Sequence, residues 1–207
     1  MVCTIDREDA DVRVRNKEER IKKKEERVMI IYIVRHGETE ENLQAILQGH
    51  MPGTLTEKGK AQVRTTAKQL AQENVRFTRI VTSDLKRATD SAQIIADELH
   101  IPVIPIEILR ERDWGKFTGM TIAEASKKYR INGKWIFPDG MAETEEGIYE
   151  RANKALSELQ KLYADETFII VTHGQFARNL IAAYSKCNYH DVPAFKNAEI
   201  RVLNISL

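Results

Sequence analysis

Two segments of the 207-residue sequence place a histidine and a glycine one residue after a run of apolar residues. The first ends in Arg35-His36-Gly37 and the second in Thr172-His173-Gly174. In open α/β sheets, ligands bind where the carboxyl ends of strands meet the following helices, whose N-termini offer free N–H donors to anions. Either histidine alone is more typical of a structural residue. Together they predict one anion-binding site flanked by two imidazoles.

Two other segments carry polar residues that could assist at such a site. Ser83 is expected to cap a helix, which places Arg87 in its first turn, where the helix dipole disfavours a positive side chain. Residues that oppose local structural preferences, as a cation in the first turn of a helix does, occur most often at functional sites. Farther along, Glu111 lies between Arg110 and Arg112, which gives a carboxylate among cations. Each feature alone is also compatible with an ordinary exposed side chain.

The elements that must position these residues follow from the hydrophobic pattern. From residue 30 onward, short apolar runs alternate with amphipathic helices, which predicts an α/β layered fold. Thr56, Ser83 and Thr144 are expected to cap three of the helices, and a fourth is expected over about 175–186. Strands are expected at 30–34, 79–82, 103–106, 168–171 and 200–205, with the third near an edge because it contains Pro105.

The charge distribution separates an N-terminal appendage, residues 1–28, from one domain, residues 29–207. The appendage carries nine Lys/Arg and eight Asp/Glu out of 32 and 31 in the chain, which leaves 23 of each sign in the domain. The appendage is expected to be a solvated helix or a disordered arm, with a partner-binding arm as the alternative. A nucleic-acid binder usually shows a clustered basic excess, so no nucleic-acid partner is expected.

The cysteines and the hydropathy indicate where the protein works. Cys3 and Cys187 are far apart and have no partner at metal-ligand spacing, which argues against a disulfide framework or a zinc site. No apolar run approaches the roughly 18 to 20 residues of a membrane span, and none resembles a secretory signal. We therefore expect a soluble, cytoplasmic protein with no membrane partner.

Six motifs in order carry a family resemblance that spans about residues 30 to 205. Arg35-His36-Gly37-Glu38-Thr39, with Asn42, Gln48-Gly49 and 55–59, resembles the signature of the histidine phosphatase superfamily, the phosphoglycerate mutase-like proteins. Residues 82–88 are similar to the family's second arginine motif, 111–115 to its acid loop and 172–174 to its second histidine motif. Glu143-Thr144 resembles its Gly-Glu-Ser helix start, with Ala142 and Thr144 substituted.

The resemblance implies a three-layer α/β sandwich with a mostly parallel central sheet flanked by helices, and a phosphohistidine chemistry without metal or cofactor. His36 would be the nucleophile and Glu111 the proton donor to the leaving oxygen. Positive and neutral donors would hold the phosphoryl group. The implied catalytic residues are His36, Glu111, His173, Arg35 and Arg87, and the implied substrate-binding residues are Asn42, Thr39, Gln48 and Gly49.

The family contains hydrolases and cofactor-dependent mutases, and the sequence favours hydrolysis of a small phosphorylated metabolite. Ile122 stands where the mutase branch has a lysine, Trp114 where it usually has tyrosine, and no adjacent arginines occur between Gly119 and Glu143. A phosphoglycerate mutase is the alternative, and a non-catalytic phosphate-binding protein is a remote one. Sugar phosphates, phosphoglycerates, a ribazole phosphate and phosphoamino acids all stay open as substrates, as does a homodimer.

Four positively charged residues near the acid loop could either bind substrate or be solvated. Lys116, Lys127, Lys128 and Arg130 could bind an acidic substrate, but charged residues on a helix are more often solvated. We expect them to be solvated.

Overall fold

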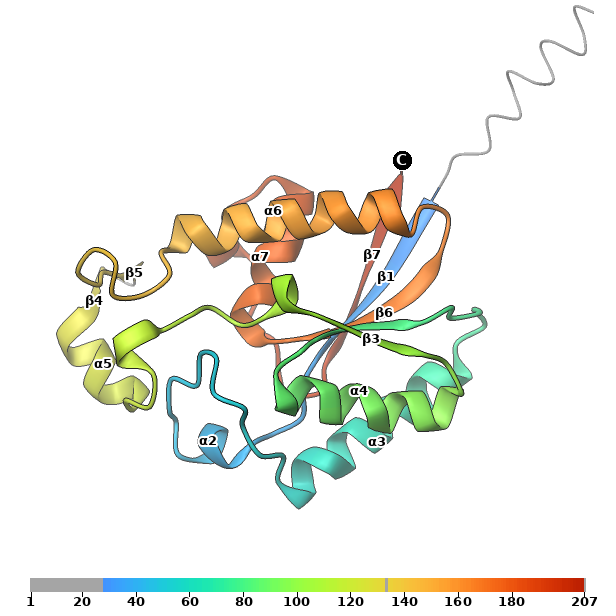
Figure 1. Ribbon diagram of the computed structural model, residues 1–207, viewed down its shortest axis with the longest axis horizontal. Coiled ribbons are helices and arrows are strands. Elements are labelled where there is room, and N and C mark those ends of the chain that lie inside the picture. Colours follow the sequence, from blue (N-terminus) through green and yellow to red (C-terminus); the bar gives the residue numbers. More distant parts are fainter. Residues whose placement is uncertain (1–27, 133, 207) are drawn as a thin grey trace, which may run out of the picture.

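The computed structural model describes residues 28–132 and 134–206. Residues 1–27 lie outside this range, so the expectation for the N-terminal appendage stays a prediction; the first strand begins at Val28. A five-stranded sheet with the order β3-β2-β6-β1-β7 forms the centre of the molecule (Figure 1). Helices cover both faces of this sheet, so the predicted three-layer α/β fold is confirmed.

All five predicted strands are present, and their apolar composition explains their central position. They are β1 (Val28–Arg35), β2 (Ile80–Ser83), β3 (Val103–Ile106), β6 (Thr167–Thr172) and β7 (Ile200–Ser206). Strand β6 is parallel to both β1 and β2, whereas β7 runs antiparallel to β1. The Pro105-containing strand β3 is at an edge, as predicted. Strands buried on both faces read as continuous apolar runs, as β1 and β6 do.

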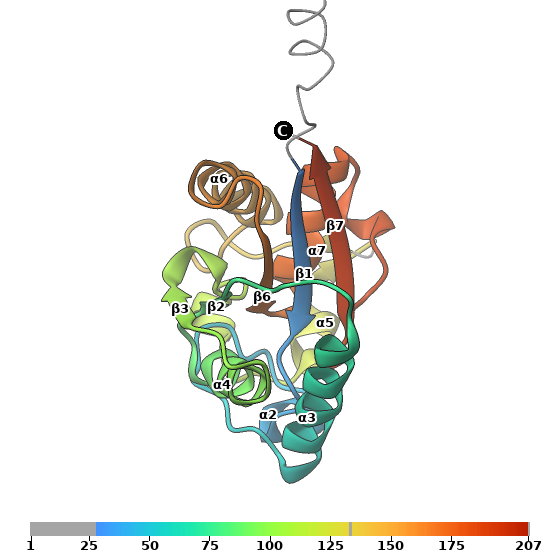
Figure 2. The ribbon, with the colours of Figure 1, turned by 90° about the vertical axis from the view of Figure 1, so that its right-hand side faces the viewer.

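The two faces of the sheet bury separate hydrophobic cores. Residues Ile31 and Ile33 of β1 pack on the side of α6 (Glu145–Leu162) and α7 (Gly174–Ser185). Tyr32 and Val34 point to the opposite side, where α3 (Glu57–Gln72) and α4 (Lys86–Leu99) pack. Figure 2 shows α6 and α7 in the upper part of the view and α3 and α4 in the lower part. This alternation follows from the two-residue period of a strand.

The helix starts confirm two predicted caps and correct a third. The hydroxyl of Thr56 accepts the N–H of Gly59, and that of Thr144 accepts the N–H of Gly147. Ser83, however, is the last residue of β2 and does not cap α4, whose N-cap is Leu85 without a side-chain bond. The prediction was wrong because the Ser83 hydroxyl has another partner, which lies in the site described below.

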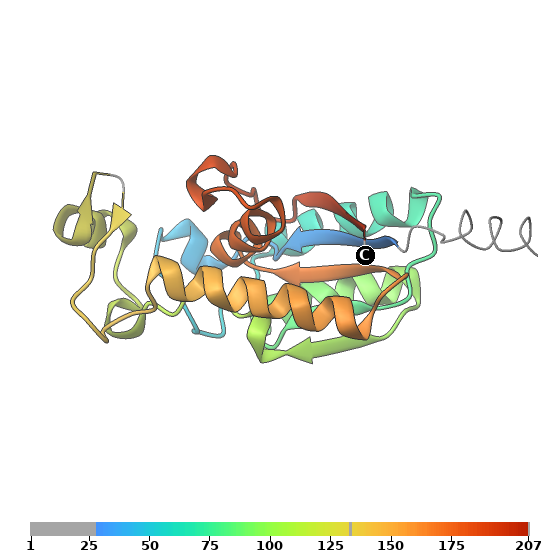
Figure 3. The ribbon, with the colours of Figure 1, turned by 90° about the horizontal axis from the view of Figure 1, so that it is seen from above.

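A small cap between the acid loop and α6 had no counterpart in the predicted elements. It contains the short helix η2 (Gly115–Phe117), helix α5 (Ile122–Tyr129) and the strand pair β4 (Arg130–Ile131) and β5 (Lys134–Trp135). Its own aromatic cluster, which includes Trp114, Phe117 and Phe137, holds it together. The cap projects from one end of the sheet (Figure 3).

The remaining short elements are α2 (Glu40–Leu43), η1 (Glu107–Leu109) and η3 (Tyr189–Asp191). Within the described part of the chain, no helix has the length and apolar character needed to cross a bilayer.

Candidate active site

The sheet topology brings the two histidine segments together. Strands β1 and β6 are adjacent and parallel, with Arg35 paired to Thr172, so His36 and His173 leave the sheet at the same edge. The two imidazole ring centroids are 5.2 Å apart, and both side chains are buried. The edge where the strands end is also the position at which α/β sheets bind ligands.

The His36 ring is oriented by its own loop. Its Nδ1 lies 2.7 Å from the carbonyl oxygen of Gly37, and since a carbonyl only accepts, Nδ1 carries the proton. The lone pair is then on Nε2. Burial and the neighbouring Arg87 and Arg35 lower the pKa of His36 well below its ordinary value, so the ring is neutral at pH 7. A neutral imidazole with a free Nε2 can act as a nucleophile.

The hydroxyl of Ser83 orients His173. Ser83 Oγ lies 2.8 Å from His173 Nε2 and also accepts the N–H of Leu85. His173 Nδ1 is buried without a partner among the described residues, and it carries the proton in the tautomer whose Nε2 accepts from the Ser83 hydroxyl. Burial and the nearby Arg87 lower the pKa of His173 well below its ordinary value. His173 therefore offers a neutral N–H donor beside His36.

The two buried neutral histidines should make stability depend on pH. Both have folded-state pKa values below the unfolded value of about 6.5, so below that pH only the unfolded chain takes up these protons. Stability is full above about pH 6.5 and should fall by about 1.4 kcal/mol per pH unit for each histidine as the pH drops toward 5. Urea unfolding at several pH values, in a phosphate-free buffer, measures the slope.

Matched variants identify the source of that slope. His173→Gln removes one of the two titrating groups and should reduce the slope between pH 6.5 and 5 by about half. His100→Asn changes an exposed residue in the left-handed region, with φ of 54°, which asparagine also adopts, and should leave the slope unchanged. A wild-type slope near zero in this window would contradict the assignment of neutral buried rings.

Two arginines add buried guanidinium groups next to the histidines. Arg35 donates from Nη1 to the carbonyl of Phe195 (2.7 Å), and Arg87 donates from Nη2 to the carbonyl of Gly49 (2.8 Å). The Nε of each is buried and has no partner among the described residues. Burial lowers the pKa of Arg87 to about 10, which still leaves it charged at pH 7. Buried, fixed cations of this kind are suited to a phosphate group.

The first turn of α7 holds the carboxylate of Glu111. Its Oε1 accepts the backbone N–H groups of Arg112 (2.9 Å) and Phe176 (3.0 Å), and its Oε2 accepts that of Gln175 (3.2 Å). The two α7 amides would otherwise be unpaired at a helix N-terminus. Glu111 is thereby fixed to the helix that directly follows His173.

A further arginine, Arg151, supports the backbone of the acid loop. It donates from Nη1 to the carbonyls of Ile108 (2.9 Å) and Arg110 (2.7 Å), and from Nη2 to that of Glu111 (3.2 Å). It also forms a bidentate pair with Glu143, at 2.8 Å for each contact. Glu143 and Arg151 therefore position the loop without lining the cavity.

The side chains of His36, the two arginines and Glu111 face one cavity of about 450 Å³ at the edge of the sheet. The cap supplies part of its wall, and the segment before β7 supplies another part. The residues that line it are Arg35, His36, Asn42, Ile46, Leu47, Gln48, Gly49, Arg87, Glu111, Trp114, Ile122, Arg130, Gly174, Gln175, Arg178, Ala194 and Phe195. His173 is not among them, but its ring centroid lies 5.2 Å from that of His36.

Three of the four expected substrate-binding residues line the cavity. Asn42 Oδ1 accepts from Thr39 N–H and from Asn197, which leaves its amide nitrogen as a donor. Gln48 has a buried, unpartnered Oε1, and Gly49 adopts φ of 50°, where a side chain would be strained. Thr39 does not line the cavity: its hydroxyl accepts the N–H of Asn42 and caps α2.

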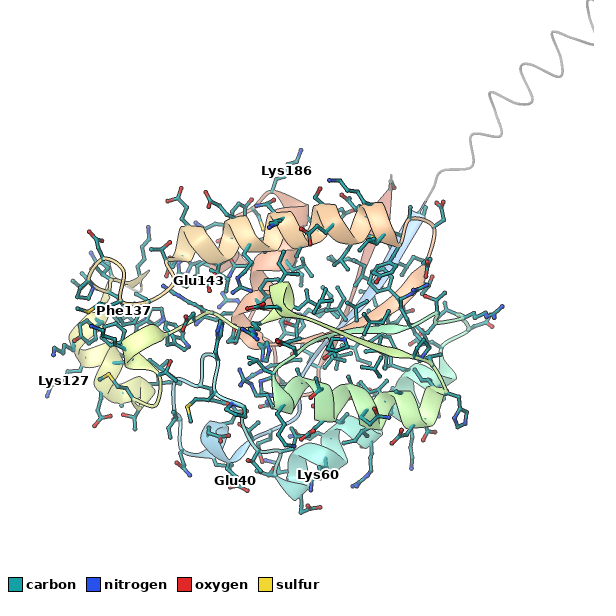
Figure 4. All side chains as sticks on the ribbon, viewed as in Figure 1. Glu40, Lys60, Lys127, Phe137, Glu143 and Lys186 are labelled. Carbon is teal, nitrogen blue, oxygen red and sulfur yellow. The ribbon has the colours of Figure 1, made fainter. Side chains whose placement is uncertain are left out.

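The sequence interpretation missed several residues of the site. Asn197 donates to the carbonyl of His36 (3.2 Å), and Arg178 lines the cavity from α7. Arg130 is exposed, as expected for a solvated charge, and it also lines the cavity. Lys127, in contrast, is exposed on the outer side of the cap (Figure 4). Arg178 could have been noticed because it follows His173 by five residues on the expected helix.

The donor set of the site is nitrogen-rich and has a single carboxylate. Within residues 28–132 and 134–206, no three His, Cys, Asp or Glu side chains gather in a way that could hold a metal ion. The fixed positive charges of the cavity are guanidinium groups. This arrangement can bind a phosphate group, place an imidazole nitrogen beside it and supply a carboxyl group for proton transfer.

Comparison with known proteins gives relatives that share most of this chain. It is 35% identical over 155 residues to an uncharacterized phosphatase, PhoE, of Bacillus subtilis, covering 75% of this chain and 77% of that protein. It is 32% identical to a probable phosphoglycerate mutase, GpmB, of Proteus mirabilis, covering 86% and 82%. A solved structure of phosphoserine phosphatase from Entamoeba histolytica, in complex with 3-phosphoglyceric acid, matches with a TM-score of 0.71 and 28% identity over 84% of this chain and 89% of that one.

The family assignment rests on nearly the whole described domain. A family model described as the histidine phosphatase superfamily (branch 1) matches residues 31–206. This range contains both histidine segments, the acid loop and the cap. The chain belongs to the histidine phosphatase superfamily.

Proposed function

We propose that the protein is a phosphomonoester phosphatase that works through a phosphohistidine on His36. The observation that carries the proposal is the neutral His36 ring, whose Nδ1 is bound to Gly37 and whose Nε2 is left free in a cavity with Arg35 and Arg87. Phosphoryl transfer depends on positioning and on positive charge around the equatorial oxygens. Relatives named as phosphatases support the same activity.

In the first step, His36 Nε2 attacks the phosphorus atom and the bond from phosphorus to the leaving oxygen breaks. Arg35, Arg87 and the Nδ1–H of His173 donate to the phosphoryl oxygens, because each has a buried donor without another partner among the described residues. Glu111, in its protonated form, gives its proton to the leaving oxygen, so that an alcohol departs.

In the second step, a water molecule attacks the phosphorus atom of the phosphohistidine. The bond to Nε2 breaks, inorganic phosphate is released and the lone pair returns to His36. Glu111, now ionised, accepts the proton that the water loses, which restores the starting state. Because the guanidinium groups supply the positive charge, neither step requires a metal ion.

Two features of the cap favour hydrolysis over mutase activity. Ile122, at the position of the lysine of the mutase branch, lines the cavity with an apolar side chain that is 42% exposed. Trp114 stands where that branch usually has tyrosine. A mutase must hold a bisphosphate and exclude water from the phosphohistidine. The apolar side chain of Ile122 carries no positive charge that could bind the second phosphate. The similarity to a probable phosphoglycerate mutase keeps mutase activity as the second candidate.

The test traps the intermediate. Brief incubation with ³²P-labelled phosphomonoester, followed by a denaturing quench, is expected to leave acid-labile, base-stable label on a peptide that contains His36. Turnover should continue in EDTA and should not require 2,3-bisphosphoglycerate. Loss of activity in EDTA with recovery in magnesium would contradict the mechanism. Phosphoglycerate interconversion that depends on 2,3-bisphosphoglycerate, without phosphate release, would establish the mutase instead.

We also propose that the enzyme works in a reducing, cytoplasmic setting on a small phosphorylated metabolite. Its two cysteines, Cys3 and Cys187, are far apart in the sequence, which does not suggest a disulfide framework. Light scattering would show whether the protein is a monomer or a homodimer in solution.

A further inference from the structure

The charged residues that line the active-site cavity are unbalanced. They comprise four arginines, Arg35, Arg87, Arg130 and Arg178, against one carboxyl group, Glu111, which is protonated when the ester binds in the proposed mechanism, and the His36 ring is neutral. Arg130 is exposed, so solvent screens its charge, and three guanidinium groups that are buried or partly buried are left. A bound phosphomonoester supplies about two negative charges at neutral pH. About one positive charge is then left for another part of the substrate.

Arg178 is the best-placed of the remaining cations because its guanidinium is fixed. Its Nε donates to the carbonyl of Val192 (2.7 Å) and its Nη2 to that of Tyr189 (2.9 Å), and the group lies 4.9 Å from the centroid of the Tyr189 ring. Arg130 is exposed in the cap, over the ring of Trp135. A fixed guanidinium loses less entropy when it binds an anion than a mobile one does.

Arg178 forms no ion pair with the described residues, because none of their carboxylates lies within 4 Å of it. Glu145 favours its charged form only from a greater distance, and the Glu145 carboxylate contacts Tyr189 and His190 instead. Its Nη1 donates no hydrogen bond to a described residue, whereas Nε and Nη2 both do. A half-buried cation that faces a cavity with one nitrogen available is arranged to bind an anion.

The wall near these cations is apolar and contains Ile46, Ile122 and Phe195. Such a wall suits the carbon chain of a small leaving group. A second phosphate on that chain would bring about two further negative charges, more than the surplus, whereas one carboxylate brings a single charge and matches it.

We propose that Arg178 binds a carboxylate on the leaving group, so that the preferred substrates are phosphate esters of small hydroxy acids. This inference rests on the proposed phosphatase activity. In it, Arg178 is a specificity-determining residue: it touches the substrate away from the phosphorus atom and takes no part in proton transfer.

The experiment compares esters that differ only in the carboxylate. One pair is 3-phosphoglycerate and glycerol 3-phosphate, and another is O-phosphoserine and O-phosphoethanolamine. The wild-type kcat/KM, normalised to that for p-nitrophenyl phosphate, should be about 10 to 100-fold higher for the carboxylated member of each pair. In Arg178→Gln the ratio within each pair should fall to near one, with a higher KM for the carboxylated ester.

Arg201 provides a matched control because it supports the same segment from outside the cavity. It donates to the carbonyls of Pro193 (2.8 Å) and Ala194 (2.9 Å), and its guanidinium lies 3.9 Å from the centroid of the Phe195 ring. Arg201→Gln removes bonds of the same kind from the same segment, so it should keep the wild-type ratio between paired esters. Arg178→Lys keeps the positive charge but loses the planar guanidinium group with its several N–H donors. It should retain part of the preference for the carboxylated ester.

The outcomes are distinguishable. Turnover of p-nitrophenyl phosphate with no wild-type preference within either pair overturns the inference and leaves the proposed function standing. An equal loss of the ratio in Arg178→Gln and Arg201→Gln overturns it too, as does tighter Arg178-dependent binding of 2,3-bisphosphoglycerate than of 3-phosphoglycerate. No turnover of any ester contradicts the proposed function and, with it, this inference.

A measurement on the wild-type enzyme covers the case in which Arg178→Gln does not fold. Glycerate and glycerol are compared as competitive inhibitors of p-nitrophenyl phosphate hydrolysis in the presence of inorganic phosphate. An inhibition constant for glycerate at least tenfold below that for glycerol supports the carboxylate site. Equal constants overturn it.

Discussion

Replacing His36 with alanine is expected to lower kcat for p-nitrophenyl phosphate by on the order of 10⁴- to 10⁶-fold, because the variant has no atom to accept the phosphoryl group. The neighbouring cations stay in place, since Arg35 and Arg87 are held by the carbonyls of Phe195 and Gly49 rather than by His36. Phosphate binding should therefore survive while turnover is lost. Stopped assays of phosphate release, with isothermal titration of inorganic phosphate, measure the two separately.

His100→Asn is the matched control, since His100 is an exposed histidine at the end of α4 and does not line the cavity. It should retain wild-type kcat. A fall of less than about tenfold in His36→Ala would show that another group is the nucleophile. Wild-type levels of trapped label in His36→Ala would contradict the phosphohistidine assignment even if turnover were slow.

Replacing Glu111 with glutamine is expected to slow phosphoryl transfer from alkyl phosphates by about 10² to 10⁴-fold, and that from p-nitrophenyl phosphate much less. An alkoxide leaving group needs a proton in the transition state, whereas a nitrophenolate departs without one. A glutamine with its oxygen in the place of Oε1 can still accept the N–H groups of Arg112 and Phe176, and only the longer bond from Gln175 (3.2 Å) is lost, so the loop should keep its position.

Hydrolysis of the phosphohistidine also uses Glu111 and would slow equally for both esters. The comparison is therefore made on the first step alone, by rapid quench, with release of the alcohol or nitrophenolate in the burst as the readout. If the burst slows by the same factor for both leaving groups, Glu111 positions the substrate and does not donate the proton. Glu107→Gln, in an exposed side chain of η1, is the control and should leave both bursts unchanged.

The strands and the meeting of the two histidine segments could be predicted because both follow from local pattern. Strands β1 and β6 are continuous apolar runs, which fits burial on two faces, and the sheet edge then places His36 next to His173. The caps at Thr56 and Thr144 follow from a hydroxyl three residues before a helical amide. Such signals lie within a few residues of the element that they determine.

The rest of the site depends on contacts between distant segments, which no local pattern contains. The Ser83 hydroxyl could act as a helix cap or as a partner for a distant histidine, and the fold places it 2.8 Å from His173. Asn197 reaches His36 across 161 positions, and nothing in its neighbourhood marks it. Arg130 lies in a small cap whose elements are too short for a periodic signal, so its place on the cavity wall needed the structure.

The cap joins the domain in a way that separates the shape of the cavity wall from the position of the acid loop. Asp113 and Glu143, at its two ends, exchange hydrogen bonds: the N–H of Glu143 donates to the carbonyl of Asp113 (2.8 Å), and the N–H of Asp113 donates to the carboxylate of Glu143 (3.0 Å). The chain thus leaves the domain and returns to it at one closed point, as an inserted module does. Backbone hydrogen bonds join Gly119, Met120 and Ile122 of the cap to the domain at Ala45 and Leu47. A change in the cap is therefore expected to affect that part of the cavity wall rather than the path of the chain at Glu111 or Arg151. A lineage of such enzymes can therefore diversify the cap, and with it part of the cavity wall, while its phosphoryl-transfer machinery is inherited unchanged.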